Sequence, residues 1–195
     1  MSRYVALNEF QDYGRNDLAG SDDLLLQSAL DAAEEMINEY CQRSFTVAAA
    51  PATARQYTPS GPWEQVLRIH DCTTITSVVE NGATVDASGY TVEPLNALGW
   101  SGQAKPYQQL RRYTGGWAWD FGKPTVTVTA TWGWVATPDA VKTATLIIAK
   151  DIAQQRNTMA GVAGFGEFGA IRVRMNPIAV NLLTPLRRVE AFGIG

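Results

Sequence analysis

The spacing of apolar residues changes twice along this chain, and those changes constrain its fold more than any other feature of the sequence. Beginning at Ser21-Asp22-Asp23, whose side chains are typical of a helix N-terminus, apolar residues recur every three or four positions. They are Leu26, Leu30, Ala33, Ile37 and Tyr40. This spacing places them on one face of a helix, which we predict from about Asp22 to Arg43. A shorter helix is predicted around Leu7–Tyr13.

From Ala54 to Trp134 the apolar spacing shifts toward two, which is the period of a β-strand. The predicted strands are Arg55–Thr58, Gln65–Ile69, Ile75–Glu80, Tyr90–Glu93, Gln108–Tyr113 and Thr125–Trp132. Asn81-Gly82 is the strongest hairpin signal, because both residues tolerate a positive φ angle. The stretch Leu95–Gly122, rich in Gly and Trp, is interpreted as a long loop or an extended hairpin.

Helical spacing returns after Thr137-Pro138-Asp139, with Thr137 as the predicted N-cap and Pro138 as the first helical residue. The buried face of this helix would consist of Val141, Ala144, Ile148 and Ile152, and we expect the helix to end near Arg156. A short strand is predicted at Ala170–Arg174. Asn176-Pro177 repeats the cap and proline pattern and predicts a last helix, Pro177–Leu183, which Pro185 should stop.

This order of elements predicts an α+β fold, namely a small helical bundle with a β-rich insertion between its two main helices and an extended C-terminal arm. We divide the chain into an N-terminal segment, 1–20, and a helical core, 21–156, with the insertion at about 54–134. The remainder, 157–195, would contain a glycine-rich hinge, a short helix and the arm. The glycines assigned to the hinge are Gly161, Gly164, Gly166 and Gly169.

Charge is distributed unevenly along the chain, although the net charge is only −3. Residues 1–40 contain two arginines and nine acids, whereas the chain from Arg156 onward contains five arginines and two acids. A net negative charge disfavours a DNA-coating protein, which needs a basic excess. The asymmetry suits head-to-tail contact between copies or separate surfaces for separate partners, and solvated faces would also produce it.

Membrane insertion and export are not expected from this sequence. No apolar run approaches the roughly 20 residues that a membrane span needs, and the N-terminus lacks the hydrophobic region of a signal peptide. The two cysteines, Cys41 and Cys72, do not form a recognisable disulfide framework. We therefore expect the protein to be made in a reducing cytoplasm.

The only cluster that suggests catalysis is His70-Asp71-Cys72. On a regular strand His70 and Cys72 would point the same way, which allows a Cys–His pair. We do not expect catalysis there, because neighbours held side by side on a strand rarely meet head-on and no third orienting group can be named. One histidine and two cysteines also make a poor zinc site. We expect no catalytic residue, no metal and no cofactor.

The run Gly164–Gly169 matches the dinucleotide pattern G-x-G-x-x-G, but it follows a helix and precedes a strand, which is the reverse of the required order. All six tryptophans lie in the β-rich region, near Lys105, Arg111 and Arg112. They would suit either stacking on single-stranded nucleic acid or an interface between subunits. We favour the interface, because no basic stripe accompanies them.

Three acids of the first long helix and two tryptophans are therefore the candidates for surfaces that face a channel or a neighbouring subunit. They are Asp31, Glu34, Glu35, Trp117 and Trp119. The acidic face is either simply solvated or lines a channel in which its charge keeps DNA from sticking. The sequence leaves both interpretations open.

Several short stretches resemble, in order and spacing, those of a known family. An acidic helix start is followed by small residues and an Arg43-Ser44-Phe45 ending, and a strand 75–79 leads to Asn81-Gly82. A β-branched strand then runs into the Gly-aromatic turn at 132–134, and Thr137-Pro138 opens a helix. The last stretch is Leu182-Leu183-Thr184-Pro185-Leu186-Arg187-Arg188-Val189. From about 21 to 189 the chain thus resembles the head-tail connector or adaptor family of tailed bacteriophages.

The resemblance implies a structural, non-enzymatic virion protein, made in the host bacterial cytoplasm and located in the neck between the capsid portal and the tail. Such proteins form a twelve-subunit ring that extends the DNA channel without sequence-specific DNA binding or membrane contact. The implied partners are the portal protein, further copies of the chain, and a downstream head-tail stopper protein. The C-terminal segment from Asn176 would reach the portal. Its expected contact residues are Pro185, Leu186, Arg187, Arg188 and Phe192.

Three other interpretations stay open. Within the structural class, the chain would be another neck protein, such as a stopper or a tail-completion protein. From a different class, a small cytoplasmic enzyme would depend on His70, and a nucleic-acid-binding module would bind DNA in a salt-sensitive way.

Overall fold

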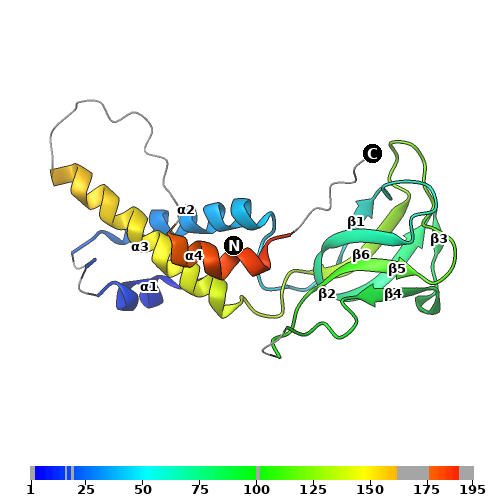
Figure 1. Ribbon diagram of the computed structural model, residues 1–195, viewed down its shortest axis with the longest axis horizontal. Helices are drawn as coiled ribbons and strands as arrows, with labels where there is room; N and C mark the ends of the chain where they lie inside the picture. The colour runs from blue at the N-terminus through cyan, green and yellow to red at the C-terminus, as the bar shows by residue number, and fades with distance from the viewer. Residues whose placement is uncertain (1–2, 16, 19, 100–101, 162–175, 189–195) are drawn as a thin grey trace. The chain divides into compact units, whose positions relative to one another are not determined.

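The computed structural model describes residues 3–15, 17, 18, 20–99, 102–161 and 176–188, and the chain forms two compact units (Figure 1). The helical unit comprises Met1–Phe45 and Thr137–Gly195, and the sheet unit comprises Thr46–Ala136. With helices in one unit and an antiparallel sheet in the other, the chain is a mixed α+β protein. The predicted fold class is confirmed at that level.

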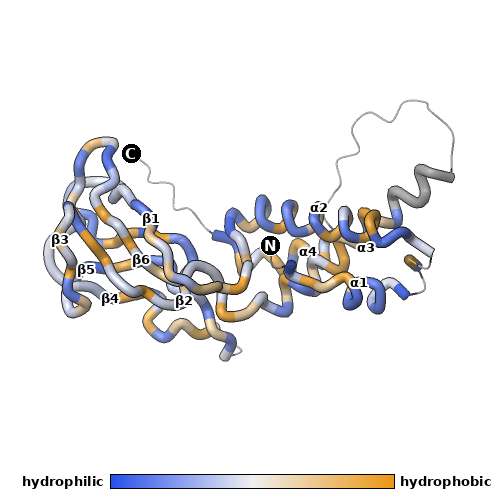
Figure 2. Tube along the Cα trace, turned by 180° about the vertical axis from the view of Figure 1, so that it is seen from behind, coloured by the Kyte–Doolittle hydropathy of each residue, from blue (hydrophilic) through white to orange (hydrophobic). Residues whose placement is uncertain are grey.

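In the helical unit, α1 (Leu7–Tyr13) and α2 (Asp23–Cys41) have the bounds expected from the sequence to within two residues. The Asp22 side chain caps α2 by accepting a hydrogen bond from the Leu24 amide at 3.2 Å. The helix ends because Gln42 adopts a left-handed backbone, with φ of 53°. Its buried face contains the predicted Leu26, Leu30, Ala33 and Ile37. Figure 2 shows hydrophilic and hydrophobic residues alternating along α2, as expected of a half-buried helix.

The second long helix, α3 (Asp139–Gly161), starts one residue later than predicted. Because the helix begins at Asp139, the residue before its first turn is Pro138 and not the predicted Thr137, and the Pro138 carbonyl accepts from the Lys142 amide at 3.1 Å. The buried Thr137 hydroxyl donates to the Phe45 carbonyl at 3.3 Å. The predicted residues Val141, Ala144 and Ile148 are buried. The helix continues past the expected end near Arg156 to Gly161.

The last helix, α4 (Pro177–Leu183), agrees with its prediction in both bounds and cap. The Asn176 side chain accepts from the Ile178 amide at 3.0 Å, and Pro177 occupies the first turn. Pro185 does not end the helical path, which continues as a 3₁₀ turn over Thr184–Leu186. In this unit α3 packs against both α2 and α4, with Ala179 and Leu183 of α4 buried.

The sheet unit contains six antiparallel strands: β1 (Thr53–Tyr57), β2 (Val66–Glu80), β3 (Ala83–Thr84), β4 (Tyr90–Glu93), β5 (Tyr107–Arg112) and β6 (Val126–Trp132). Their order is β1-β6-β2-β5-β4, with β3 paired to β2. The β2–β3 turn is the predicted Asn81-Gly82, and both residues have positive φ, 47° and 83°. The stretch 95–122, predicted as a long loop or an extended hairpin, contains β5, which pairs with both β4 and β2.

Strand β2 corrects the prediction of two separate strands in its region. Its 15 residues pair with β5 along the first half and with β6 along the second half. Register shifts lie between Arg68 and Cys72 and between Cys72 and Ser77, and such bulges bend a strand. A single bent strand therefore holds both halves of the sheet around one apolar core. That core contains Leu67, Ile69, Cys72, Val78, Leu110, Trp117, Val126, Val128 and Ala130.

Candidate interaction surfaces

The C-terminal residues of the described chain are fastened to the end of α2. Arg187 Nε donates to the Tyr40 carbonyl at 3.2 Å, and the Arg188 amide donates to the Cys41 carbonyl at 2.9 Å. In return, Arg43 Nη1 donates to the Leu186 carbonyl at 3.3 Å. The last carbonyls of a helix lack intrahelical partners and carry partial negative charge, so cationic residues stabilise this end.

Residues 184–188 therefore belong to the helical unit, although the sequence suggested a free arm there. The guanidinium of Arg187 also lies 4.9 Å from the centre of the Tyr40 ring. Pro185 and Arg187 remain exposed, whereas Leu186 and Arg188 are half-buried. Phe192 lies outside the described residues.

Of the four glycines assigned to a hinge, Gly161 is the last residue of α3. Gly164, Gly166 and Gly169 lie outside the described part of the chain, as does the predicted strand Ala170–Arg174. The structure therefore places only one of these residues, and it places that one in a helix.

The acids of α2 do not all face solvent in the same way. Glu35 is exposed, and Asp31 is exposed and paired with Arg3 at 3.0 Å. Glu34 is half-buried and accepts from the Tyr4 amide at 2.7 Å. Burial raises the pKa of the Glu34 carboxyl above its ordinary value. Glu34 thus holds the N-terminal segment, and Asp31 and Glu35 are the members of the set that offer charge to a partner.

The two candidate tryptophans have different environments. Trp117 is 2% exposed, its Nε1 donates to the Gln65 carbonyl at 2.9 Å, and it lies in the sheet core. It offers no surface to a neighbouring subunit, which corrects the expectation from sequence. Trp119 is partly exposed and packs edge-on against Phe121, with 5.9 Å between the ring centres.

Two loops of the sheet unit are joined at both ends, and we name residues 58–65 and 113–125 the loop pair. The Trp117 amide donates to the Glu64 carbonyl at 2.9 Å, and the Thr125 amide donates to the Tyr57 carbonyl at 3.2 Å. Exposed on this pair are Trp63, at 84%, and Phe121, at 83%. Sequence reasoning did not single out either residue. The available signal was an aromatic residue placed beside Gly or Pro, in Gly61-Pro62-Trp63 and Phe121-Gly122.

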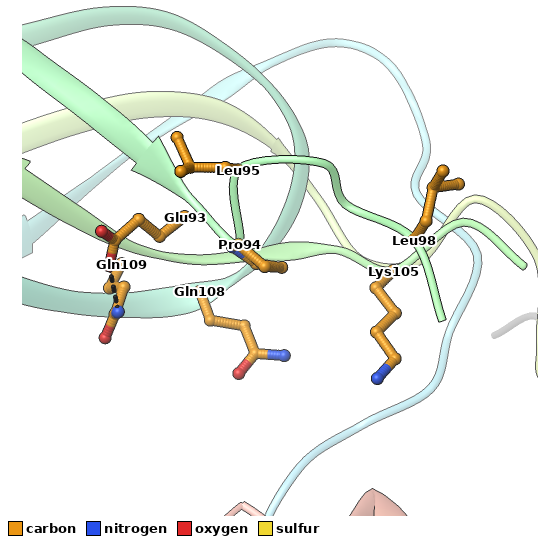
Figure 3. A pocket seen from close by; sticks show the side chains of 7 residues that line it. All are labelled: Glu93, Pro94, Leu95, Leu98, Lys105, Gln108 and Gln109. Atoms are coloured by element: carbon orange, nitrogen blue, oxygen red, sulfur yellow. Dashed lines mark hydrogen bonds between the residues drawn. The ribbon is translucent and has the colours of Figure 1, made fainter. Parts of the chain in front are cut away.

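A groove of about 450 Å³ lies on the same unit, at the end of β4 and the beginning of β5 (Figure 3). Its lining residues are Glu93, Pro94, Leu95, Leu98, Lys105, Gln108 and Gln109. Figure 3 shows Lys105 and Gln108 extending to the same side of the strands, with Glu93 hydrogen-bonded to Gln109. Glu93 also pairs with Arg111 at 2.8 Å, and this hydrogen bond lowers the pKa of its carboxyl. The groove combines an apolar rim with an ammonium group.

The His70-Asp71-Cys72 cluster does not form a Cys–His pair. His70 is exposed and its Nδ1 lies 2.9 Å from the Tyr57 hydroxyl, whereas Cys72 is completely buried. The register shift between Arg68 and Cys72 interrupts the alternation that would have put both side chains on one face. Burial raises the pKa of Cys72 to about 12 and that of Cys41 to about 11, so neither thiol is activated.

The described residues contain no group of three or more His, Cys, Asp or Glu side chains arranged to hold a metal ion. No helix within them is long and apolar enough to span a membrane.

Comparisons with known proteins detect likeness in the fold. No protein-family model and no curated protein sequence matches the chain. Among solved structures, it is similar to a chain in the neck of an empty GTA particle computed with C6 symmetry, at 18% identity and a TM-score of 0.56. It is also similar to a chain in the virion of a native gene transfer agent (GTA) particle, at 18% identity and a TM-score of 0.54. Both likenesses cover 97% of this chain and 92% of the other.

At this level of identity the likeness establishes a shared fold. It extends over nearly all of both chains, so it includes the helical and the sheet units together. The fold therefore agrees with the resemblance that the sequence suggested.

Proposed function

We propose that this chain is a structural virion protein, the head-to-tail adaptor that joins the portal of a phage-like particle to its neck. Twelve copies would form a ring that extends the DNA channel and supports a downstream stopper protein. The observation that carries this proposal is the fold likeness to a neck chain, which spans 97% of the sequence and both units. A neck computed with C6 symmetry is a cyclic assembly, which favours a ring of repeated copies.

The chemistry of the described residues supports a structural role over an enzymatic one. Catalysis needs an activated nucleophile or a convergent acid and base. Here burial raises the pKa of both thiols, and the His70 ring contacts Tyr57 and Trp132 at 5.7 and 6.3 Å between ring centres. His70 is better explained as part of an aromatic cluster to which β1, β2 and β6 each contribute one ring.

For the portal contact we propose the end of the helical unit where α2 meets the C-terminal residues. Pro185 and Arg187 are exposed there, and Arg187 is already oriented by the Tyr40 ring and carbonyl. A pre-oriented guanidinium loses little freedom on binding a carboxylate. Leu186 and Arg188 would fix this surface in place, and the chain beyond, including Phe192, would extend the contact. The glycines at 164, 166 and 169 would allow the segment before α4 to adjust.

For the channel we propose the exposed acids of α2. Asp31 and Glu35 lie one helical turn apart, and Glu39 continues the row. Negative charge on the wall repels the DNA backbone and so prevents sticking while the genome passes. In the assembled virion the genome would therefore contact the ring without sequence-specific binding.

The experiment that tests the adaptor role is binding to the portal ring encoded in the same genome. Full-length chain should be retained by the portal, whereas Arg187→Glu should weaken retention by tenfold or more. A chain that ends at Arg188 separates the described contacts from the residues that follow, and it keeps α4 intact. The control is Lys142→Glu, which also reverses a charge on the helical unit, in α3.

Loss of retention with Arg187→Glu but not with Lys142→Glu would support both the role and the site. Equal retention of all variants would support the role and exclude this site. If the wild-type chain fails to bind an intact portal ring but binds a tail-side neck protein, the stopper or tail-completion interpretation replaces the adaptor.

A further inference from the structure

Trp63 combines two properties that its own fold does not explain. Its backbone has a φ of 67°, a region that bulky residues rarely occupy, and its side chain is 84% exposed. Burial of the Trp63 side chain therefore does not offset the free-energy cost of this backbone conformation. Gly116 lies so close that a Cβ atom there would be 2.5 Å from the Trp63 Cα. Unusual backbone conformations that the surroundings enforce are concentrated at functional sites, so Trp63 is a candidate contact residue.

Phe121 is held out to solvent by a second set of constraints. It lies in a tight turn in which the Lys123 amide donates to the Asp120 carbonyl at 3.1 Å, and Gly122 has a φ of 73°. The Ala118 amide donates to Glu80 at 2.7 Å, and the Thr125 hydroxyl donates to the Ala118 carbonyl. The loop pair thus presents two aromatic side chains from a fixed backbone. Binding through such anchors loses little conformational entropy.

The groove lies at the opposite end of the same two strands. In the β4–β5 ladder, Tyr90 pairs with Arg112 at the end that leads into the loop pair, and Glu93 pairs with Gln109 at the end that forms the groove. Leu95 and Leu98 are 72% and 58% exposed at the groove. The Lys105 amide donates to the Ala97 carbonyl at 2.6 Å, which fixes the loop that carries both leucines. An aromatic projection and a groove lined by both apolar and polar side chains therefore lie at opposite ends of β4 and β5.

Charge makes the two surfaces complementary. Glu64 follows Trp63 on the loop pair, and Lys105 lines the groove. Glu64 accepts a hydrogen bond from the Ser60 amide at 3.0 Å, but within the described residues neither Glu64 nor Lys105 forms an ion pair. Glu93 of the groove, in contrast, is paired with Arg111. Residues 46–136 contain six acids and six arginines or lysines, so the unit has no net charge to attract nucleic acid or an anionic membrane.

We propose that copies of this chain bind head to tail through these surfaces, with Trp63 and Phe121 of one copy inserted into the groove of the next and Glu64 beside Lys105. The inference rests on the proposed ring, because it identifies a contact between neighbouring subunits. A projection and a recess on different parts of one molecule form a heterologous contact, which generates a closed ring or an open filament. The groove, at about 450 Å³, is in the size range of protein ligand sites, about 300–1,000 Å³.

Disulfide trapping tests this contact even if the ring is short-lived in solution. The full chain carrying both Glu64→Cys and Lys105→Cys is oxidised mildly at its highest soluble concentration and analysed without reductant. Cys41 and Cys72 are completely buried, so the two introduced thiols are the reactive ones. We expect a ladder of cross-linked species. Each single variant should remain monomeric, and an equal mixture of the two single variants should stop at a dimer.

Two further variants of the double-cysteine chain are compared in the same assay, one as the test and one as the control. Trp63→Ser with Phe121→Ser, added to the double-cysteine chain, should reduce the ladder at least tenfold. Asp86→Ser changes an exposed residue outside the loop pair and the groove and should leave the ladder unchanged. A disulfide dimer of the Glu64→Cys chain alone would overturn the proposal, since it would indicate a symmetric contact. Absence of any cross-link from the double variant would overturn it as well.

Portal binding, measured on the same samples, separates the two proposals. If the portal retains the chain but no cross-links form, the adaptor role is supported and only this contact between subunits is excluded. If cross-links form but the portal does not retain the chain, the head-to-tail contact is supported and the adaptor role is excluded.

Discussion

The hydroxyl of Tyr4 accepts a hydrogen bond from the Phe45 amide at 2.8 Å. This bond joins the segment before α1 to the last residue of the first part of the helical unit. Both side chains are buried, and their rings pack edge-on with centres 6.1 Å apart. Because an amide that loses its partner in the interior cannot reach water, this bond fixes how the N-terminus lies on α2.

Replacing Tyr4 by Phe should lower the free energy of unfolding by about 1–3 kcal/mol, which is the cost of leaving a buried donor unsatisfied. Urea unfolding of the two chains at pH 8 measures this difference. Tyr13→Phe is the control, since Tyr13 is about half exposed, at 47%. It should change stability by less than about 0.5 kcal/mol.

The buried Tyr4 hydroxyl also predicts that the stability of the protein changes at alkaline pH. Burial raises the pKa of Tyr4 above its ordinary value of 10.0 in the folded protein. The folded state thus holds this proton more tightly than the unfolded state does. The stability linked to the proton is complete below pH 10 and decreases as the pH rises through the raised pKa. The stability advantage over Tyr4→Phe should therefore shrink above pH 10, and an advantage that grows there would contradict the assignment.

The ion pair between Glu80 and Arg112 joins the end of β2 to the end of β5, beside the loop pair. The two side chains are 17% and 21% exposed, and Glu80 also accepts from the Ala118 amide. Glu80→Ala would leave a half-buried guanidinium without its carboxylate, and we expect a loss of about 2–4 kcal/mol. In a double-mutant cycle with Arg112→Ala, the double variant should lose less than the sum of the singles. Additive losses would mean that the two charges do not act as a pair.

Gly116 is expected to be the position of the loop pair that tolerates substitution least. A Cβ atom there would meet backbone atoms of Trp63 at 2.5 Å. Gly116→Ala should therefore cost about 1–3 kcal/mol and displace Trp63. The matched control is Gly61→Ala, which would meet nothing within 4 Å. Thermal unfolding and the cross-linking ladder should both change for Gly116→Ala and stay near wild type for the control.

The two native thiols should be unreactive until the protein unfolds. Burial raises their pKa to about 11 for Cys41 and about 12 for Cys72. At pH 8 roughly one thiol in 1,000 and one in 10,000, respectively, would be ionised. Labelling by a chromogenic disulfide reagent should be slow in buffer and rapid in denaturant. Rapid labelling of the folded chain would show that one of these sites opens to solvent.

The helices were predictable because their determinants are local. In α2 and α4 the cap residues Asp22 and Asn176 act as their identities indicate, since a cap needs only the amides that follow it. The same holds for the Asn81-Gly82 turn, where two small residues with positive φ decide the hairpin. Thr137 was not predictable in this way, because its hydroxyl bonds to Phe45, which is distant in sequence.

The candidate surfaces were only partly predictable. Trp117 and Trp119 are two positions apart and equally aromatic, yet one fills the core and the other reaches solvent. Trp63 and Phe121 gave no periodic signal, because each lies in a turn and its exposure depends on the other loop of the pair. Arg187 and Arg188 suggested a free basic arm, but the carbonyls that they bind belong to α2.

The sequence by itself determined the mixed α+β class, the bounds of α1, α2 and α4, and the hairpin after β2, because each depends on residues within one or two turns of chain. Only the tertiary structure decided that β2 is one bent strand, that Cys72 faces the core while His70 does not, and that an aromatic loop pair and a groove occupy opposite ends of β4 and β5. These features depend on strand pairing between distant segments. A single bulge changes which face of the sheet a side chain occupies. Whether a strand bulges depends on the strand that pairs with it, and the apolar spacing within one segment does not reveal that partner.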